Sequence, residues 1–87
     1  MKDIILIFDV ETSGLYDYRK PIEKQPYVLQ FSYVLYDIVR HQIVKSVNSY
    51  INVDESVAIT DETVKINGCT RELCNEGEPI HCLLTNF

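Results

Sequence analysis

The stretch IILIFDVETSGL, residues 4–15, decides the fold of this chain. Its first five residues are all apolar and three of them are isoleucine, which favours a β-strand buried on both faces in the centre of a sheet. Side chains alternate along a strand, so Asp9 and Glu11 should lie on the same face. The small polar residues 12–14 then end the strand. The sequence therefore predicts a buried strand that presents two carboxylates side by side where it ends.

The chain around this strand is short and acidic. Its 87 residues correspond to one domain or part of one. A composition of 46% hydrophobic and 24% charged residues excludes disordered and collagen-like classes. The net charge of −5 argues against a basic coat that binds nucleic acid by phosphate neutralisation alone, so any such contact would need help from cations. No apolar run is long enough for a membrane span or a signal peptide, which predicts a soluble, intracellular protein without a membrane partner.

Two more strands are expected after a long loop over residues 15–26. Residues 27–37 are rich in Val, Leu, Phe and Tyr, and residues 43–52 alternate between apolar and polar side chains. The connection between them is short, and short connections join antiparallel neighbours. With the first strand near 3–10, the sequence predicts a three-stranded antiparallel meander.

Short helices are expected in the remainder of the chain. Thr60 and Thr70 can each cap a helix, the Asn67-Gly68 pair can end the first one, and Pro79 suits the first turn of a last one. The apolar stripe of that last helix contains Ile80, Leu83, Leu84 and Phe87. Because this stripe is still running at the last residue, we expect residues 1–87 to form a single, truncated α/β domain.

The two carboxylates are candidates for a metal site. Successive same-face residues of a strand lie about 6 to 7 Å apart at Cα, so Asp9 and Glu11 could bind one ion, and carboxylate oxygens suit Mg²⁺ or Mn²⁺. The alternative is that Asp9 simply ends the strand and residues 11–14 form a solvated turn, since Asp-x-Glu is frequent by chance. The apolar strand before the pair and the polar turn and leucine after it favour a site.

The segment FDVETSGL, from Phe8 to Leu15, resembles the first motif of the DEDD, or DnaQ-like, 3'-5' exonucleases, which have a ribonuclease H-like fold. The order of the following strands and the segment 64–70 are also similar to that family. Many members carry His in this segment where the present chain has Asn67. The resemblance covers essentially the whole chain, although only the first motif is specific. It implies a ribonuclease H-like partial domain of the α/β class.

The resemblance also implies a mechanism, in which two Mg²⁺ or Mn²⁺ ions activate a water and stabilise the leaving oxygen of a phosphodiester. Asp9 would bridge both ions and Glu11 would bind the ion that carries the water. The backbone at Thr12 would meet the terminal 3'-hydroxyl, and Leu15 would press on the last base or, alternatively, serve only as loop packing. The partner would be single-stranded or 3'-terminal nucleic acid. The family's other catalytic residues would lie beyond Phe87, so we expect no turnover from this chain alone.

Other chemistry-bearing residues have plainer interpretations. An aromatic and basic cluster after the motif could stack on and neutralise single-stranded nucleic acid or could be a solvated loop; it comprises Tyr16, Tyr18, Arg19 and Lys20. His41 and His81 are expected on the surface. The three cysteines, Cys69, Cys74 and Cys82, match no zinc spacing and are odd in number, which predicts reduced, packed thiols.

Two further hypotheses remain open. The chain could be a non-catalytic partial domain that associates with itself or with an exonuclease half through the strand near 3–10, because in a ribonuclease H-like sheet that strand has a neighbour that is missing here. It could also be a small globular domain whose Asp-x-Glu sequence is accidental.

Overall fold

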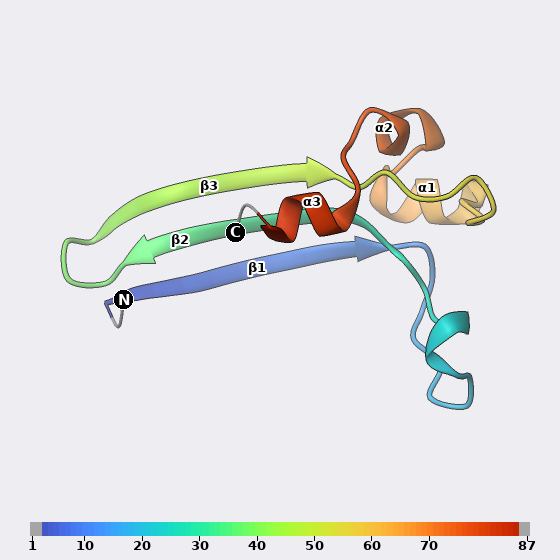
Figure 1. The fold of residues 1–87 in the computed structure, drawn as a ribbon, viewed down its shortest axis with the longest axis horizontal. Coiled ribbons are helices and arrows are strands. Elements are labelled where there is room, and N and C mark those ends of the chain that lie inside the picture. The colour runs from blue at the N-terminus through green and yellow to red at the C-terminus, as the bar shows by residue number, and fades with distance from the viewer. Residues whose placement is uncertain (1–2, 86–87) are drawn as a thin grey trace.

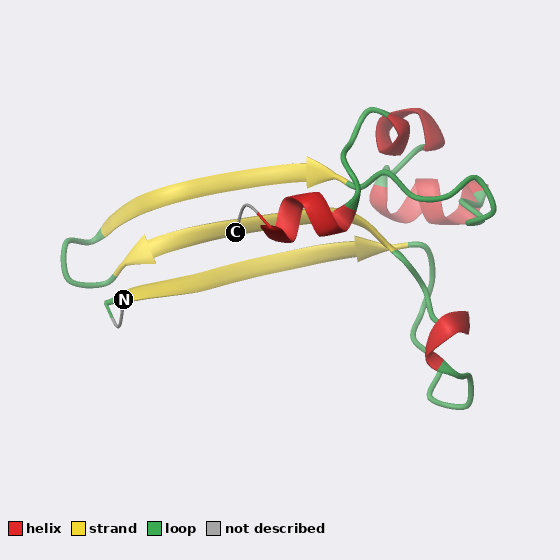
Figure 2. Cartoon of the chain, viewed as in Figure 1, coloured by secondary structure: helices red, strands yellow, loops and turns green. Residues whose placement is uncertain are grey.

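The computed structural model describes residues 3–85 and contains one antiparallel sheet followed by short helices (Figure 1). The strands are β1 (Ile4–Thr12), β2 (Val28–Asp37) and β3 (Gln42–Tyr50), in the sheet order β1-β2-β3. The helices are the 3-10 turn η1 (Ile22–Lys24), α1 (Asp61–Asn67), α2 (Arg71–Asn75) and α3 (Ile80–Thr85). Figure 2 shows the helices after the sheet gathered near one end of it. The predicted three-stranded meander followed by short helices is confirmed.

The strand register follows the alternation of the sequence. In β1, Asp9 lies opposite Ser32 and Glu11 lies opposite Gln30 of β2, with an irregularity after Glu11. Strand β1 continues to Thr12, so both carboxylates belong to the strand. His41 lies in the turn between β2 and β3, where its φ of 56° is left-handed, and its side chain is exposed as expected.

The helix boundaries follow the expected capping residues. The Thr60 side chain accepts a hydrogen bond from the backbone of Thr63, and Thr70 accepts one from Leu73. Helix α1 ends at Gly68, whose φ of 72° is the left-handed conformation that glycine adopts without strain. Of the predicted apolar stripe of α3, Leu83 is buried, Ile80 packs against the core and Leu84 is half exposed, while Phe87 lies outside the described residues.

Two hydrophobic clusters hold the helices to the sheet. The first contains Phe31, Tyr33, Ile51 and Leu83, and forms where α3 lies across the sheet (Figure 1). The second joins β2 to the segments around α1 and α2 and contains Leu29, Cys69 and Cys74. All three cysteines are unpaired thiols, and the first two are buried. That these thiols are reduced stays a prediction.

The prediction that β1 is buried on both faces in the centre of the sheet is wrong. Within residues 3–85 this strand pairs only with β2 and forms an edge, and Ile7 and Phe8 are 54% and 60% exposed. An apolar strand is buried only where another element covers it, and the helices cover the opposite end of the sheet. The surface of 6606 Å² exceeds the roughly 5,300 Å² expected for a compact monomer of this mass. Much of the sheet is therefore uncovered.

No helix within the described part of the chain is both long and apolar enough to cross a membrane. The intracellular location stays a prediction.

Candidate functional site

Asp9 and Glu11 project from the same face of β1 at the end nearest the helices. Their register partners on β2, Ser32 and Gln30, are polar. The side chains that alternate with them along β1 belong to the opposite face. There Phe8 stacks on Phe31 of β2 with ring centroids 5.9 Å apart. The alternation inferred from the sequence thus places two carboxylates over a polar strip of the sheet.

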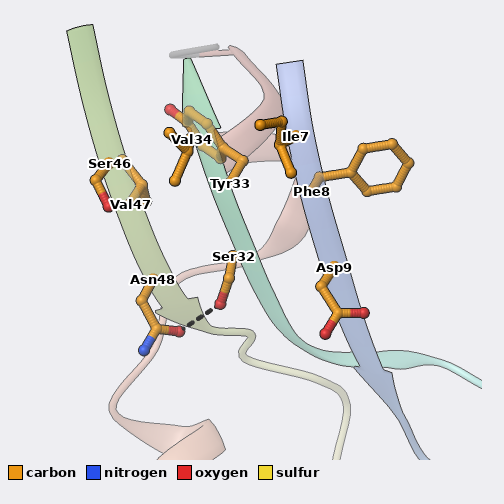
Figure 3. Close-up of a pocket in the computed structure, with 9 residues that line it drawn as sticks. All are labelled: Ile7, Phe8, Asp9, Ser32, Tyr33, Val34, Ser46, Val47 and Asn48. Carbon is orange, nitrogen blue, oxygen red and sulfur yellow. Dashed lines mark hydrogen bonds between the residues drawn. The ribbon is translucent and has the colours of Figure 1, made fainter. Parts of the chain in front are cut away.

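Asp9 faces a shallow depression of about 280 Å³ on this face (Figure 3). Figure 3 shows its carboxylate on the same side of the sheet as Ser32 and Asn48. The Ser32 hydroxyl donates to Asn48 Oδ1 at 2.8 Å, and Gln30 Nε2 donates to the same oxygen at 2.8 Å. Asp9 Oδ1 accepts only the backbone N–H of Val10, at 3.0 Å, among the hydrogen bonds of the described residues. Its carboxylate is therefore exposed and open to a further ligand.

Glu11 lines a second depression, of about 190 Å³, between β1 and α1. Thr12 and Leu15 line it as well, so three of the four predicted site residues meet here, while Asp9 lies in the neighbouring depression. Leu15 is 93% exposed and Ile66, across the depression on α1, is 78% exposed. The description of Leu15 as ordinary loop packing does not fit this exposure. Two apolar side chains instead flank a polar floor.

The turn that carries these residues is fixed by α1. Asn67 Nδ2 donates to the carbonyl oxygen of Thr12 at 3.0 Å, and the Thr63 hydroxyl donates to the carbonyl oxygen of Ser13 at 3.3 Å. The backbone N–H of Ser13 also donates to the Tyr27 carbonyl at 2.9 Å. Sequence reasoning missed this positioning role of Asn67. The sequence did contain a signal for this role. Asn67 is a polar amide at the expected end of a helix, in the segment where many DEDD exonucleases carry His.

The residues present fit part of a divalent-cation site. Ion pairs within residues 3–85 join Arg19 to Asp17 and Arg40 to Asp37, and neither involves Asp9 or Glu11. Asp9 is exposed and Glu11 is half-buried. Two such carboxylates without a cationic partner in the described chain suit a hard ion such as Mg²⁺ or Mn²⁺. No group of three or more potential ligands occurs in the part of the chain that the structure describes. The pair therefore supplies some of the ligands such an ion needs.

Cys69 lies beside the acidic pair and is no competing ligand. Burial raises the pKa of its thiol, and the charges of Cys74 and Glu11 raise that pKa further. The thiol donates to Gln30 Oε1 across 3.7 Å. Because metals bind the thiolate, a protonated Cys69 is a structural residue at neutral pH.

The remaining candidates lie apart from the acidic pair. His81 is exposed on α3, and the side chains of Tyr16 and Tyr18 are 75% and 83% exposed in the loop after β1. Arg19 binds Asp17 through two side-chain hydrogen bonds of 3.1 and 3.2 Å. These bonds lower the pKa of Asp17.

The fold is similar to that of solved nucleases. Cell-death related nuclease 4 (CRN-4) aligns over 98% of this chain with 24% identity and a TM-score of 0.74. A 3'-exonuclease solved in a study of 3'-end recognition of a histone mRNA stem-loop aligns over 97% with 19% identity and a TM-score of 0.75. The nuclease domain of 3'hExo, a DEDDh family member bound to rAMP, aligns over 97% with 19% identity and a TM-score of 0.74. The resemblance to DEDD exonucleases is thus confirmed at the level of the fold.

The likeness covers only part of those proteins. The chain spans 28%, 36% and 41% of the three structures, respectively. No protein-family model and no curated protein sequence matches it. At these identities the likeness establishes a nuclease-like fold, and the chemistry must be argued from this chain's own residues.

Proposed function

We propose that this chain is the N-terminal part of a metal-dependent 3'-5' exonuclease and contributes half of its metal site. The observation that carries the proposal is the pair Asp9, which is exposed, and Glu11, which is half-buried, on one face at the end of β1 and without a cationic partner in the described chain. The nuclease-like fold supports it, because the pair lies within the segment that resembles the first exonuclease motif. Residues 1–87 would then be a single, incomplete domain.

The proposed roles of the residues are those that the resemblance to the exonuclease motif implies. Asp9 and Glu11 bind and orient two divalent ions, Mg²⁺ or Mn²⁺, which when bound activate water and stabilise the leaving oxygen of the phosphodiester. The depression between β1 and α1 receives the 3'-terminal nucleoside, since two exposed apolar side chains that line it, Leu15 and Ile66, can contact a base. The backbone at Thr12, held by Asn67, meets the terminal 3'-hydroxyl. Single-stranded or 3'-terminal nucleic acid is therefore the proposed substrate.

The chain alone should be inactive. Family members use four carboxylates, whereas this face of β1 presents two, and the described residues contain no third ligand beside them. A complementing chain or segment would have to supply the others. A labelled oligonucleotide incubated with the chain and Mn²⁺ should therefore stay intact, and its shortening would contradict this part of the proposal.

The metal site can be tested by thermal unfolding in the presence of Mn²⁺. An ion that binds only the folded state raises stability by mass action, by about 2.7 kcal/mol at one hundred times its dissociation constant. We expect the unfolding midpoint to rise with Mn²⁺ in the unmodified chain and to stay constant in Asp9→Asn and Glu11→Gln. Glu72→Gln, an exposed carboxylate on α2, is the control and should keep the rise. An equal rise in Asp9→Asn, or none in the unmodified chain, would refute the site and favour an accidental Asp-x-Glu.

A second candidate function is non-catalytic association through β1. The observation that favours it is the apolar edge of this strand, where Ile5, Leu6, Ile7 and Phe8 are 41 to 60% exposed. An unpaired apolar edge is a template for pairing with another strand, and antiparallel pairing of two copies of β1 about a two-fold axis would cover it. An exonuclease half could cover the same edge.

Light scattering across a range of protein concentrations tests this candidate. The unmodified chain should form dimers, and Ile7→Lys should shift the equilibrium to monomers because charge on an edge strand opposes pairing. Ile66→Lys, on the exposed face of α1, is the control and should still dimerise. A monomeric unmodified chain at high concentration would exclude self-association.

A further inference from the structure

A groove lies next to the proposed nucleoside depression, on the other side of the turn after β1. It has a volume of about 480 Å³ and runs between the loop that joins β1 to β2 and the segment 56–58. Gly14 and Leu15 line both this groove and the depression that contains Glu11. The two sites are therefore immediate neighbours with Leu15 at their shared boundary.

Two lysines give the groove a positive charge in an otherwise acidic protein. Lys20 and Lys24 line it, whereas no carboxylate is among its lining residues in the described chain. Neither lysine takes part in an ion pair within residues 3–85. The third basic residue of this loop, Arg19, is already bound to Asp17. The charge of Lys20 also acts on the nearby Asp17, whose pKa it helps to lower. In a chain of net charge −5, the lining of the groove is thus a local concentration of positive charge.

The walls of the groove are held in place by side-chain hydrogen bonds to backbone carbonyl groups. On one side, Gln25 Nε2 donates to the carbonyl oxygens of Asp17 at 2.6 Å and of Lys20 at 2.8 Å, which closes the loop that carries the lysines. On the other side, the Arg71 guanidinium donates to the carbonyl oxygens of Val53 and Val57. A groove with both walls fixed loses little conformational entropy when a ligand binds.

An aromatic side chain completes the lining. Tyr27 lies in the groove and is 52% exposed, so its ring can stack on a base without selecting a sequence. Lysine ammonium groups on flexible stems suit phosphates of variable position. Alternating phosphates and bases are the chemistry that this combination of lysines and tyrosine matches.

We propose that this groove binds the backbone of single-stranded nucleic acid, with Lys20 and Lys24 contacting phosphates upstream of the terminal nucleotide. The inference rests on the proposed function, which places the terminal nucleoside on the other side of Leu15. It extends the binding site beyond the acidic pair and makes affinity dependent on strand length. It also assigns different roles to two members of the aromatic and basic cluster. Lys20 binds the nucleic-acid strand, whereas Arg19 forms an ion pair with Asp17 inside the loop.

The test measures binding of a short 5'-labelled oligothymidylate by fluorescence anisotropy, without divalent ions. Each phosphate contact on a single strand contributes about −0.7 to the slope of log affinity against log salt. The variant Lys20→Gln/Lys24→Gln should therefore bind equally at about 1 M salt and about eightfold more weakly per lysine at about 50 mM. The control Arg40→Gln/Lys65→Gln removes the same charge from exposed positions outside the groove and should bind like the unmodified chain.

A second arm uses a nucleoside 5'-monophosphate, whose binding should be the same in the lysine variant and the unmodified chain because it does not reach the groove. Equal weakening by both double variants, or equal weakening of mononucleotide and oligonucleotide by the lysine variant, would overturn the proposal. So would an unmodified chain that fails to bind the oligonucleotide. Because this assay contains no metal, such a failure is separate from the Mn²⁺ result at Asp9 and Glu11.

Discussion

The two ends of the sheet contain equally apolar strands and yet differ in packing. At the helical end, formed by residues 28–33, 47–53 and 57–83, Leu29, Ile51 and Cys74 are almost fully buried. At the open end, formed by residues 4–8 and 34–46, Leu6 and Ile43 are 42% and 64% exposed. The difference teaches that an apolar sequence specifies a strand, whereas its burial depends on the elements that reach it.

The candidate site residues Asp9 and Glu11 lie where the two ends meet. Asp9 follows the last exposed apolar residues of β1, and Glu11 precedes the turn that Asn67 binds. The acidic pair is therefore supported on one side by α1 and open on the other. A partner that covered the open end would also approach the proposed metal ligands.

The largest expected effect is that Gly77→Ala disrupts the packing of the helical end against the sheet. A Cβ at this position would lie 2.0 Å from the Tyr50 carbonyl oxygen and 2.5 Å from its carbon, and this backbone has no room to move because Ile51 pairs with Glu78. We expect the free energy of unfolding to fall by more than about 4 kcal/mol, in the exceptional range for a single substitution. Urea denaturation measures the change.

The matched control is Gly68→Ala, where nothing lies within 4 Å and only the φ of 72° opposes a side chain. Its cost should be about 1 to 2 kcal/mol. Equal effects of the two substitutions would show that Gly77 does not hold the helical end to the sheet.

The same Leu→Ala substitution at each end of the sheet measures how much side-chain burial contributes to stability there. Leu29→Ala removes a fully buried side chain from the cluster with Cys69 and Cys74 and should destabilise the fold by about 3 kcal/mol. Leu6→Ala at the open end should change stability by about 0.5 kcal/mol or less in the monomer. Both values come from chemical denaturation at low protein concentration. A large cost at Leu6 would mean that the open end is covered in solution.

The smallest expected effect is a pH dependence of the free energy of unfolding that arises from two buried thiols at the helical end. Burial raises the pKa of the Cys69 and Cys74 thiols above the ordinary value of 9.0. The unfolded chain then loses these protons first, so the stability they contribute is present below about pH 9 and falls as pH rises beyond it. Denaturation between neutral and alkaline pH should show a steeper loss in the unmodified chain than in Cys69→Ala/Cys74→Ala. Parallel curves would contradict the burial of these thiols.

Much of this architecture was available from local patterns. Capping by Thr60 and Thr70, the stop at Gly68 and the alternation that puts Asp9 and Glu11 on one face depend on near neighbours along the chain, and the structure has all of them. Three of the four predicted site residues, Glu11, Thr12 and Leu15, line one depression, while Asp9 lines the neighbouring one. The roles of these residues stay predictions until metal and substrate binding are measured.

The strands, the helix ends and the shared face of the two carboxylates were predictable from local sequence, because each follows from residues close together in the chain. The folded structure was needed to show how far β1 is exposed, that Asn67 binds the Thr12 carbonyl 55 residues away, and that Lys20 and Lys24 share a groove with Leu15. The physical reason is that burial, positioning and local charge depend on contacts between distant segments. Such contacts carry no periodic signal along the sequence.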